Sequence, residues 1–167
     1  MAEDFEDVAV FSLSDEREAT LLAKQTECTF MWTNADGDAV GVIMNYVVHD
    51  GRFWLTGSGQ RKRFAALRRR ARASIAVTSR GTDIGVSQSL TYKGDVVLHT
   101  DDETKAWFYP ALAARVRPGN TTQQGAFAAH LDSPNRVIIE LVPELRIGFD
   151  AEHMFHGTQA GPSSTQV

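Results

Sequence analysis

The chain contains a single cysteine, Cys28, among its 167 residues. It therefore cannot form an intrachain disulfide, and a metal site built from several thiolates is excluded. No apolar run approaches the roughly 20 residues that cross a bilayer, and the N-terminal sequence MAEDFEDVAV is acidic where a secretory signal would be basic. These absences predict a cytoplasmic protein with no membrane partner.

The composition is that of an ordinary globular protein, with 43% hydrophobic and 23% charged residues. A chain of this length is expected to form one domain, which we place at residues 1–156. Residues 157–167 are polar and show no periodicity, so they are expected to form a disordered tail.

Excess positive charge is also missing, because 17 basic and 21 acidic side chains give a net charge of −4. A general attraction to nucleic acid is therefore not expected. The charge is nevertheless uneven, since seven of the twelve residues at 61–72 are Lys or Arg.

Strands dominate the pattern. Runs of β-branched and aromatic residues alternate with turn sequences such as Asn34-Ala35-Asp36-Gly37, and they predict strands at 28–33, 39–48, 52–56, 73–78, 86–99 and 135–149. Capping residues and helical spacing predict helices at 15–25, 60–71 and 121–131, and another that is capped by residues 100–103 and carries Trp107, Phe108 and Leu112. Local connections between the strands favour a small antiparallel β-barrel of the α+β class, with bends at Gly94 and Gly148.

The join between the third strand and the basic helix is the strongest candidate site. Free backbone N–H groups at a helix start bind anions, and the site residues expected to assist are Thr56, Ser58, Arg61, Lys62 and Arg63. The alternative is a solvated basic helix face. Cations at a helix N-terminus oppose the helix dipole by roughly 0.3–1 kcal/mol each, which favours a bound anion. The cations at the other end of the helix are assigned a structural role: Arg68, Arg69, Arg70 and Arg72.

No catalytic or metal-binding constellation is evident. The five histidines are scattered, and the pair His153 and His156 has no third ligand. Cys28 lies among strand residues, where cysteines mostly serve packing. We therefore assign no catalytic residue and no metal ligand, and any chemistry must come from a cofactor.

Several segments resemble the pyridoxamine 5′-phosphate oxidase-like flavin-binding split barrels, including their actinobacterial flavin/deazaflavin-dependent relatives. Residues 36–56 are similar to the family's hairpin and third strand, residues 61–63 to its phosphate-binding turn, and residues 72–77 and 90–97 to later strands. The match spans residues 15–149. It implies an α+β fold, a six-stranded antiparallel split β-barrel with flanking helices.

The resemblance also implies a cofactor, FMN or coenzyme F420, and residues that bind it. Lys62 falls on a basic family position in both possible registers, whereas Arg61 and Arg63 each match in one. Thr56 matches a threonine near the flavin phosphate. Contacts to the ring are implied for Gly41, Val42, Ile43, Met44, Gln88 and Ser89.

This sequence departs from the family at two points. Ala71 stands where a proline is usual after the helix, and the arginine and histidine set that holds pyridoxal phosphate in the true oxidases is absent. The resemblance therefore does not extend to the vitamin substrate.

Three functions are left open. The leading one is a flavin- or deazaflavin-dependent oxidoreductase that transfers a hydride to or from a small organic substrate. By the resemblance it is a homodimer, with aromatic residues such as Trp107 or Tyr46 at the interface. The second is a non-catalytic flavin-binding or carrier protein of the same fold. The third, nucleic-acid binding through the arginine-rich helix, is disfavoured by the acidic net charge.

Overall fold

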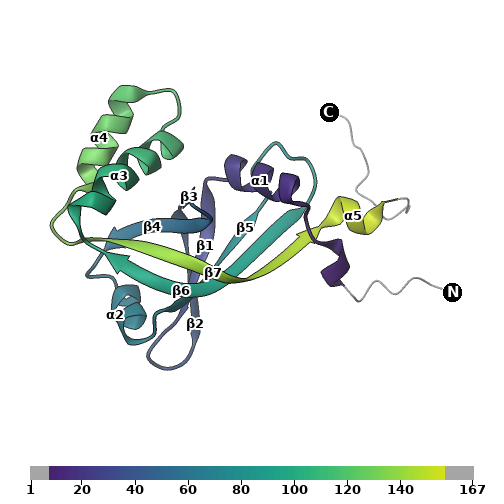
Figure 1. Cartoon of the computed structure of the whole chain (residues 1–167), viewed down its shortest axis with the longest axis horizontal. Coiled ribbons are helices and arrows are strands. Elements are labelled where there is room, and N and C mark those ends of the chain that lie inside the picture. Colours follow the sequence, from purple (N-terminus) through teal and green to yellow (C-terminus); the bar gives the residue numbers. More distant parts are fainter. Residues whose placement is uncertain (1–7, 157–167) are drawn as a thin grey trace.

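The structure is a computed structural model that describes residues 8–156 (Figure 1). The strands are β1 (Glu27–Thr33), β2 (Ala39–Asn45), β3 (Val47–His49), β4 (Arg52–Ser58), β5 (Arg72–Thr78), β6 (Gln88–His99) and β7 (Arg136–Asp150). The helices are η1 (Val8–Phe11), α1 (Asp15–Lys24), α2 (Lys62–Arg69), α3 (Asp102–Val116), α4 (Thr121–Leu131) and α5 (Ala151–Phe155). The segment 157–167, expected to be a disordered tail, lies outside the described residues.

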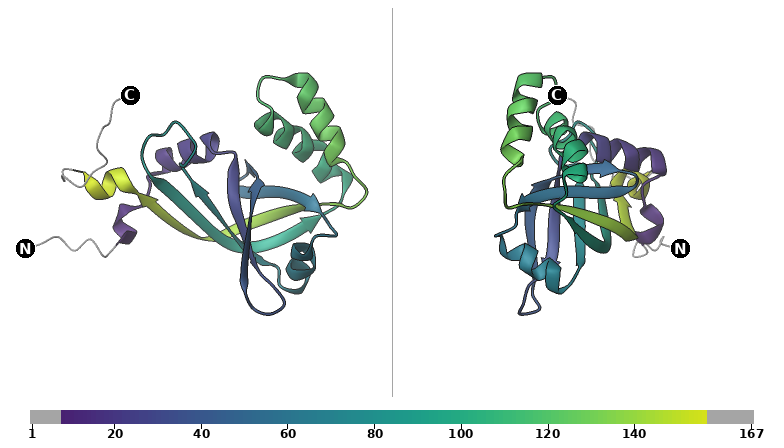
Figure 2. Two further views of the ribbon diagram at one scale, coloured as in Figure 1. Left: turned by 180° about the vertical axis from the view of Figure 1, so that it is seen from behind. Right: turned by 60° about the vertical axis from the view of Figure 1, so that its left-hand side comes forward.

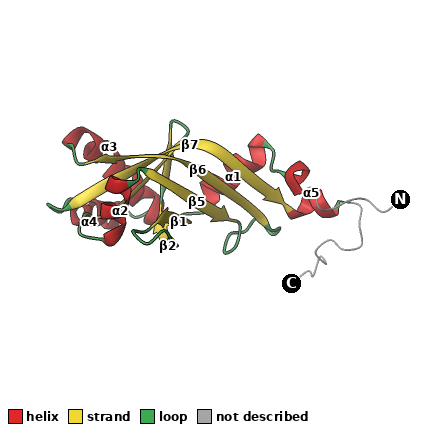
Figure 3. Cartoon of the chain, turned by 90° about the horizontal axis from the view of Figure 1, so that it is seen from below, coloured by secondary structure: helices red, strands yellow, loops and turns green. Residues whose placement is uncertain are grey.

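All seven strands form one antiparallel sheet in the order β2-β1-β5-β6-β7-β4-β3. The two edge strands of this order, β2 and β3, are neighbours in the sequence, so the sheet curls until its edges approach each other (Figures 1 and 3). This curled sheet with flanking helices confirms the predicted α+β barrel class.

The strand count differs by one from the six expected, because the strand predicted at 39–48 is interrupted at Tyr46. Before Tyr46 the chain pairs with β1, and after it with β4. The Tyr46 side chain is fully buried, and its hydroxyl donates to the Leu22 carbonyl at 3.3 Å. Tyr46 therefore belongs to the subunit's own core, and the expectation that it contributes to a dimer interface is wrong.

Two clusters of buried hydrophobic residues stabilise the sheet and its helices. The larger fills the inside of the curl with residues of β1, β4, β5, β6 and β7, and Leu21 of α1 joins it. The smaller lies between the sheet and the α3–α4 hairpin, where Trp54 and Ile138 pack against Phe108 and Leu112. The hairpin projects at one end of the sheet, and η1, α1 and α5 lie toward the other (Figure 2).

The helices follow the capping signals in the sequence. The Ser14 hydroxyl accepts from the Arg17 N–H and begins α1, and Asp101 caps α3 in the same way. Helix α4 has the predicted bounds, whereas α2 is shorter than the 60–71 predicted. Among the residues that the structure describes, no helix is long and apolar enough to cross a membrane.

Gly94 bends β6, as predicted. The pairing of β6 with β7 shifts register between Lys93 and Gly94, which is the signature of a β-bulge. A Cβ at Gly94 would lie 1.8 Å from the Val142 carbonyl oxygen, so no side chain fits. The pairing continues without a shift through Gly148, where the lack of a side chain instead lets Ser12 approach.

Replacing Gly94 with Ala should lower the free energy of unfolding by about 3 kcal/mol, because backbone must move to admit the methyl group. Gly125→Ala is the matched control, since nothing lies within 4 Å of its Cβ position. Alanine in α4 should raise stability by up to about 1 kcal/mol. Urea unfolding measures both, and an unchanged midpoint for Gly94→Ala would show that the bulge tolerates a side chain.

Candidate functional site

The turn between β4 and α2 brings together most of the residues expected to bind phosphate. Thr56 and Ser58 end β4, and the Ser58 carbonyl accepts from the Arg61 N–H at 3.0 Å. Arg61 is the N-cap of α2, but its side chain makes no capping hydrogen bond. The helix therefore begins with backbone donors and three successive cations, Arg61, Lys62 and Arg63 (the α2 cations).

Glycines let two arginines approach this turn. A Cβ built at Gly57 would lie 3.5 Å from Arg63 Nη2, and one built at Gly59 would lie 4.0 Å from Arg68 Nη2. Both guanidinium groups therefore flank the Gly57-Ser58-Gly59 backbone. The sequence predicts a structural role for Arg68 at the far end of the helix, but its side chain also reaches the turn. The signal that could have identified it is length, because an eight-residue helix spans only about 12 Å.

The α2 cations have no carboxylate partner within residues 8–156, and neither do Arg68, Arg69 and Arg70. Arg63 is the most confined of them. Its guanidinium lies over the Trp32 ring, 5.8 Å from the centroid, and its Nε is buried without a hydrogen-bond partner. Burial lowers the Arg63 pKa, and the neighbouring charge of Arg61 lowers it further. A bound anion would favour the charged form of Arg63 and so raise its pKa again.

Arg72 shows the contrasting situation. It makes ion pairs with Asp95 at 2.7 Å and Glu144 at 2.6 Å, and these two carboxylates raise its pKa. The structural role expected for Arg72 fits these contacts. It joins β5 to β6 and β7 and offers no free charge.

Thr56 is placed differently from expectation. Its hydroxyl donates to the Val137 carbonyl at 2.9 Å, inside the β4–β7 pairing. The hydroxyl proton is therefore engaged by the sheet, and only the oxygen lone pairs remain for a ligand. The Ser58 side chain is half-buried at the end of the same strand.

The family resemblance predicts that residues 41–44 of β2 contact the cofactor ring. Only two of these four residues face away from the core. Val42 and Met44 pack into the larger core cluster. Gly41 and Ile43 face away from it, and Ile43 is 62% exposed. A Cβ at Gly41 would lie 3.2 Å from Thr29 and 3.3 Å from Met31. Glycine therefore keeps the surface flat at this point.

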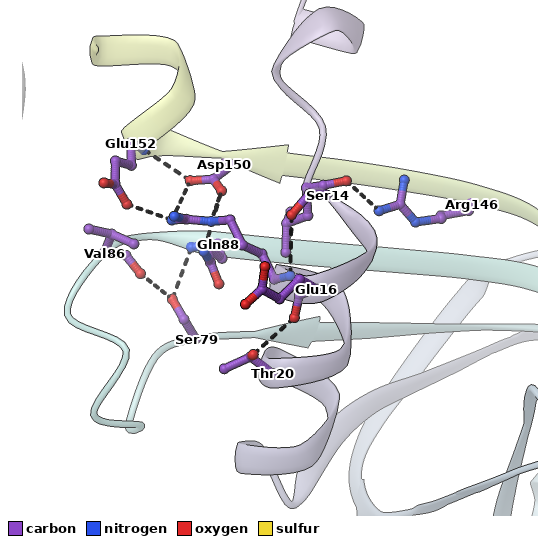
Figure 4. A network of polar contacts seen from close by, with 11 residues as sticks. Ser14, Glu16, Thr20, Ser79, Val86, Gln88, Arg146, Asp150 and Glu152 are labelled. Carbon is purple, nitrogen blue, oxygen red and sulfur yellow. Dashed lines mark hydrogen bonds and ion pairs between the residues drawn. The ribbon is translucent and has the colours of Figure 1, made fainter. Parts of the chain in front are cut away.

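Gln88 is expected to contact the cofactor ring, but it does not lie beside the α2 cations. It begins β6 near α1 and α5, is 3% exposed, and donates to Asp150 at 3.3 Å (Figure 4). Asp150 in turn pairs with Arg17 at 2.5 Å, which ties the N-terminal helix to the end of β7. These contacts fit a fold-stabilising role for Gln88. Its neighbour Ser89 is half-buried on the opposite face of β6.

No cluster of three or more metal-ligating side chains exists in the described part of the chain. His99 lies 2.7 Å from the buried Glu140 carboxylate, which also pairs with Arg52. His49 packs against Trp107 with ring centroids 4.5 Å apart. His49 therefore contacts α3, and His99 belongs to a polar cluster with residues of β4 and β7.

Comparison with known proteins identifies the family and the fold that this chain shares. The family model described as pyridoxamine 5′-phosphate oxidase matches residues 14–147. A conserved hypothetical protein from Mycobacterium tuberculosis is similar in structure, with a TM-score of 0.75 and 17% identity over 99% of this chain and 100% of that one. No curated protein sequence matches the chain.

Two further solved structures share the fold. One is an FAD-binding protein from Mesorhizobium loti, with a TM-score of 0.63 and 16% identity over 84% of this chain and 96% of that one. The other is HutZ, a heme storage protein from Vibrio cholerae, with a TM-score of 0.62 and 11% identity over 82% of this chain and 94% of that one.

Cys28 should be chemically inert. Burial raises its pKa from 9.0 to about 12, which lowers the thiolate fraction at pH 8 roughly a thousandfold. Its reaction with 5,5′-dithiobis(2-nitrobenzoate) at pH 8 should be at least about a hundredfold slower in the native protein than in urea. Native and unfolded rates within tenfold of each other would place the thiol at an accessible surface.

Proposed function

Because the chain belongs to the pyridoxamine 5′-phosphate oxidase family, we propose that it binds FMN or coenzyme F420 and transfers a hydride between that cofactor and a small organic substrate. One observation carries the proposal: the α2 cations face no carboxylate in the described chain, and Arg63 keeps a buried Nε without a partner. Both cofactors carry a phosphate that would meet this need.

The residues present fit such a group. Lys62 and Arg61 are exposed at the start of α2, where charge-assisted hydrogen bonds to a phosphate are strong. The helix dipole and the free N–H groups of its first turn add to the attraction. Gly41 and Ile43 supply a flat outer surface on β2 for a planar ring. When bound, the cofactor would supply the hydride chemistry.

The protein's own contribution is positioning. We assign no residue as a general acid or base, and held geometry alone can lower a barrier by several kcal/mol. The same absence of acid–base groups leaves a non-catalytic binding protein as the second candidate. A protein of the same fold is described as a heme storage protein, so the fold itself does not separate the two candidates. A purified protein that binds flavin yet turns over no substrate with the reduced cofactor would support the second candidate.

A homodimer is the assembly we propose, and its interface would be the outer face of the sheet. Strand register aligns Ile43, Thr29, Ala76, Thr91 and Ile147 in one row across five strands. Ile43 is 62% exposed and Ile147 is 58% exposed. A second copy would cover this row and enclose the surface beside β2.

Lys62→Ala should weaken binding of the cofactor by about 1.5–3 kcal/mol, the scale of a charge-assisted hydrogen bond. Arg69→Ala is the control, because it removes a cation from the same helix away from the turn. Fluorescence titration with FMN and with the deazaflavin coenzyme measures both variants. If Lys62→Ala bound as tightly as the parent protein, the phosphate site would lie elsewhere.

Ile147→Asp should convert the dimer to a monomer, because a carboxylate would be buried in the proposed interface at the β7 end of this row. Sedimentation velocity at micromolar concentration should show a dimer for the parent protein and a monomer for the variant. A Val10→Asp variant, which also loses an exposed apolar side chain, should remain dimeric. A monomeric parent protein would contradict the proposed interface.

A further inference from the structure

Trp32 is the last residue of β1 that faces the inside of the curled sheet. Side chains alternate along a strand, so Trp32 lies on the same face as Cys28 and Phe30, which both belong to the larger core cluster. Its ring stacks on that of Phe30, with centroids 5.9 Å apart and an interplanar angle of 29°. Phe30 is fully buried. This contact therefore restricts the motion of the Trp32 ring.

Arg63 reaches the Trp32 ring from the first turn of α2. Its guanidinium carbon lies 5.8 Å from the ring centroid. The same group approaches the backbone of β4, because a Cβ built at Gly57 would lie 3.5 Å from Arg63 Nη2. The guanidinium therefore lies close to both β1 and β4, and it links the β4–α2 turn to a strand that precedes it in the chain by about 30 residues.

The contact with Trp32 leaves the donors of Arg63 free. No described residue accepts a hydrogen bond from Arg63, and its buried Nε has no partner. An arginine has five N–H donors. The face of an aromatic ring attracts the positive charge and uses none of them.

Other arginines of this protein are fixed in a different way. Arg17 pairs with Asp150, and Arg72 pairs with Glu144. A carboxylate partner occupies N–H donors and neutralises the charge, so such an arginine has little left for a ligand. A ring partner fixes the guanidinium without either effect. This difference makes Arg63 a fixed cation whose donors remain available.

We propose that Trp32 is a positioning residue for the anion site at the β4–α2 turn. Its ring fixes the Arg63 guanidinium, and the N–H groups of Arg63 bind the phosphate of the ligand. The inference rests on the proposed function in one respect, that this ligand is the flavin or deazaflavin cofactor. An arginine that is fixed before the ligand arrives loses less conformational entropy on binding. Trp32 therefore strengthens binding of the phosphate and not of the cofactor ring.

The experiment is a calorimetric titration with FMN and with riboflavin at one low salt concentration, and the ratio of the two dissociation constants is the phosphate preference. Trp32→Leu should lower this preference at least about threefold and leave the riboflavin affinity within about twofold of the parent value. Trp32→Phe keeps an aromatic face and should retain the preference. Trp107→Leu is the matched control, because it removes a half-buried tryptophan that contacts Trp54 and Phe108 instead. Thermal melts confirm that each variant is folded.

A double-mutant cycle tests whether Trp32 acts through Arg63. Arg63→Gln should lower the phosphate preference, and adding Trp32→Leu to it should lower the preference no further. A general structural role of Trp32 would instead weaken binding in both backgrounds. The proposal is overturned if Trp32→Leu keeps the preference, if its effect persists beside Arg63→Gln, or if riboflavin affinity falls as much as FMN affinity.

Titration with pyrophosphate separates this proposal from the proposed function, because pyrophosphate has no ring. It should bind the parent protein at least about threefold more tightly than it binds Trp32→Leu. If this holds while the parent protein binds neither FMN nor the deazaflavin coenzyme, the role of Trp32 stands and the proposed function is contradicted. If neither pyrophosphate nor a cofactor binds, both are overturned. Where only the deazaflavin coenzyme binds, it and its phosphate-free form replace FMN and riboflavin.

Discussion

The architecture depends on the single residue that separates β2 from β3. These strands occupy opposite edges of the sheet order, yet only Tyr46 lies between them in the chain. A flat sheet of seven strands spaced about 4.8 Å apart would hold its edges nearly 30 Å from each other, which one residue cannot span. The sheet therefore curls, and the bulge at Gly94 provides part of that curvature. The enclosed apolar cluster and the outward-facing surface of β2 both follow from this closure.

The basic side chains of this fold differ in whether they have a carboxylate partner. Elsewhere basic side chains fasten the elements to one another, as Arg17 does with Asp150, Arg72 with Glu144 and Arg146 with Glu18. The segment around α2 has no such partners among the described residues. Leaving successive cations together at a helix N-terminus costs stability, and a bound anion offsets that cost. This is the physical reason for our proposal that the β4–α2 turn binds an anion.

Much of the fold could be predicted because the responsible interactions are local. Side-chain alternation located the strands, and Ser14 and Asn120 marked the starts of α1 and α4. The interruption at Tyr46 could not be predicted, since it depends on a hydrogen bond to Leu22 and on pairing with two distant strands. The short helices η1 and α5 lack a strong periodic signal and were also missed.

The candidate site could be predicted only in part, for a similar reason. The α2 cations were identified from their position at a helix start, which is a local property. The placement of Gln88 depends on Asp150, 62 residues away in the sequence, and the Thr56 hydroxyl is engaged by Val137. Arg68 reaches the turn only because Gly59 has no side chain. Contacts with residues so distant in the sequence cannot be predicted from the sequence around each residue.

The most direct test of the phosphate site is the affinity of the unmodified protein for each cofactor compared with its phosphate-free form, riboflavin in the case of FMN. Calorimetry at fixed, low salt concentration isolates the phosphate contribution, because the ring is the same in both ligands. Unpaired cations at the start of α2 predict that the phosphorylated form binds at least about tenfold more tightly, with a difference that shrinks as salt is added. Equal affinities for the two forms would contradict a phosphate site at this turn.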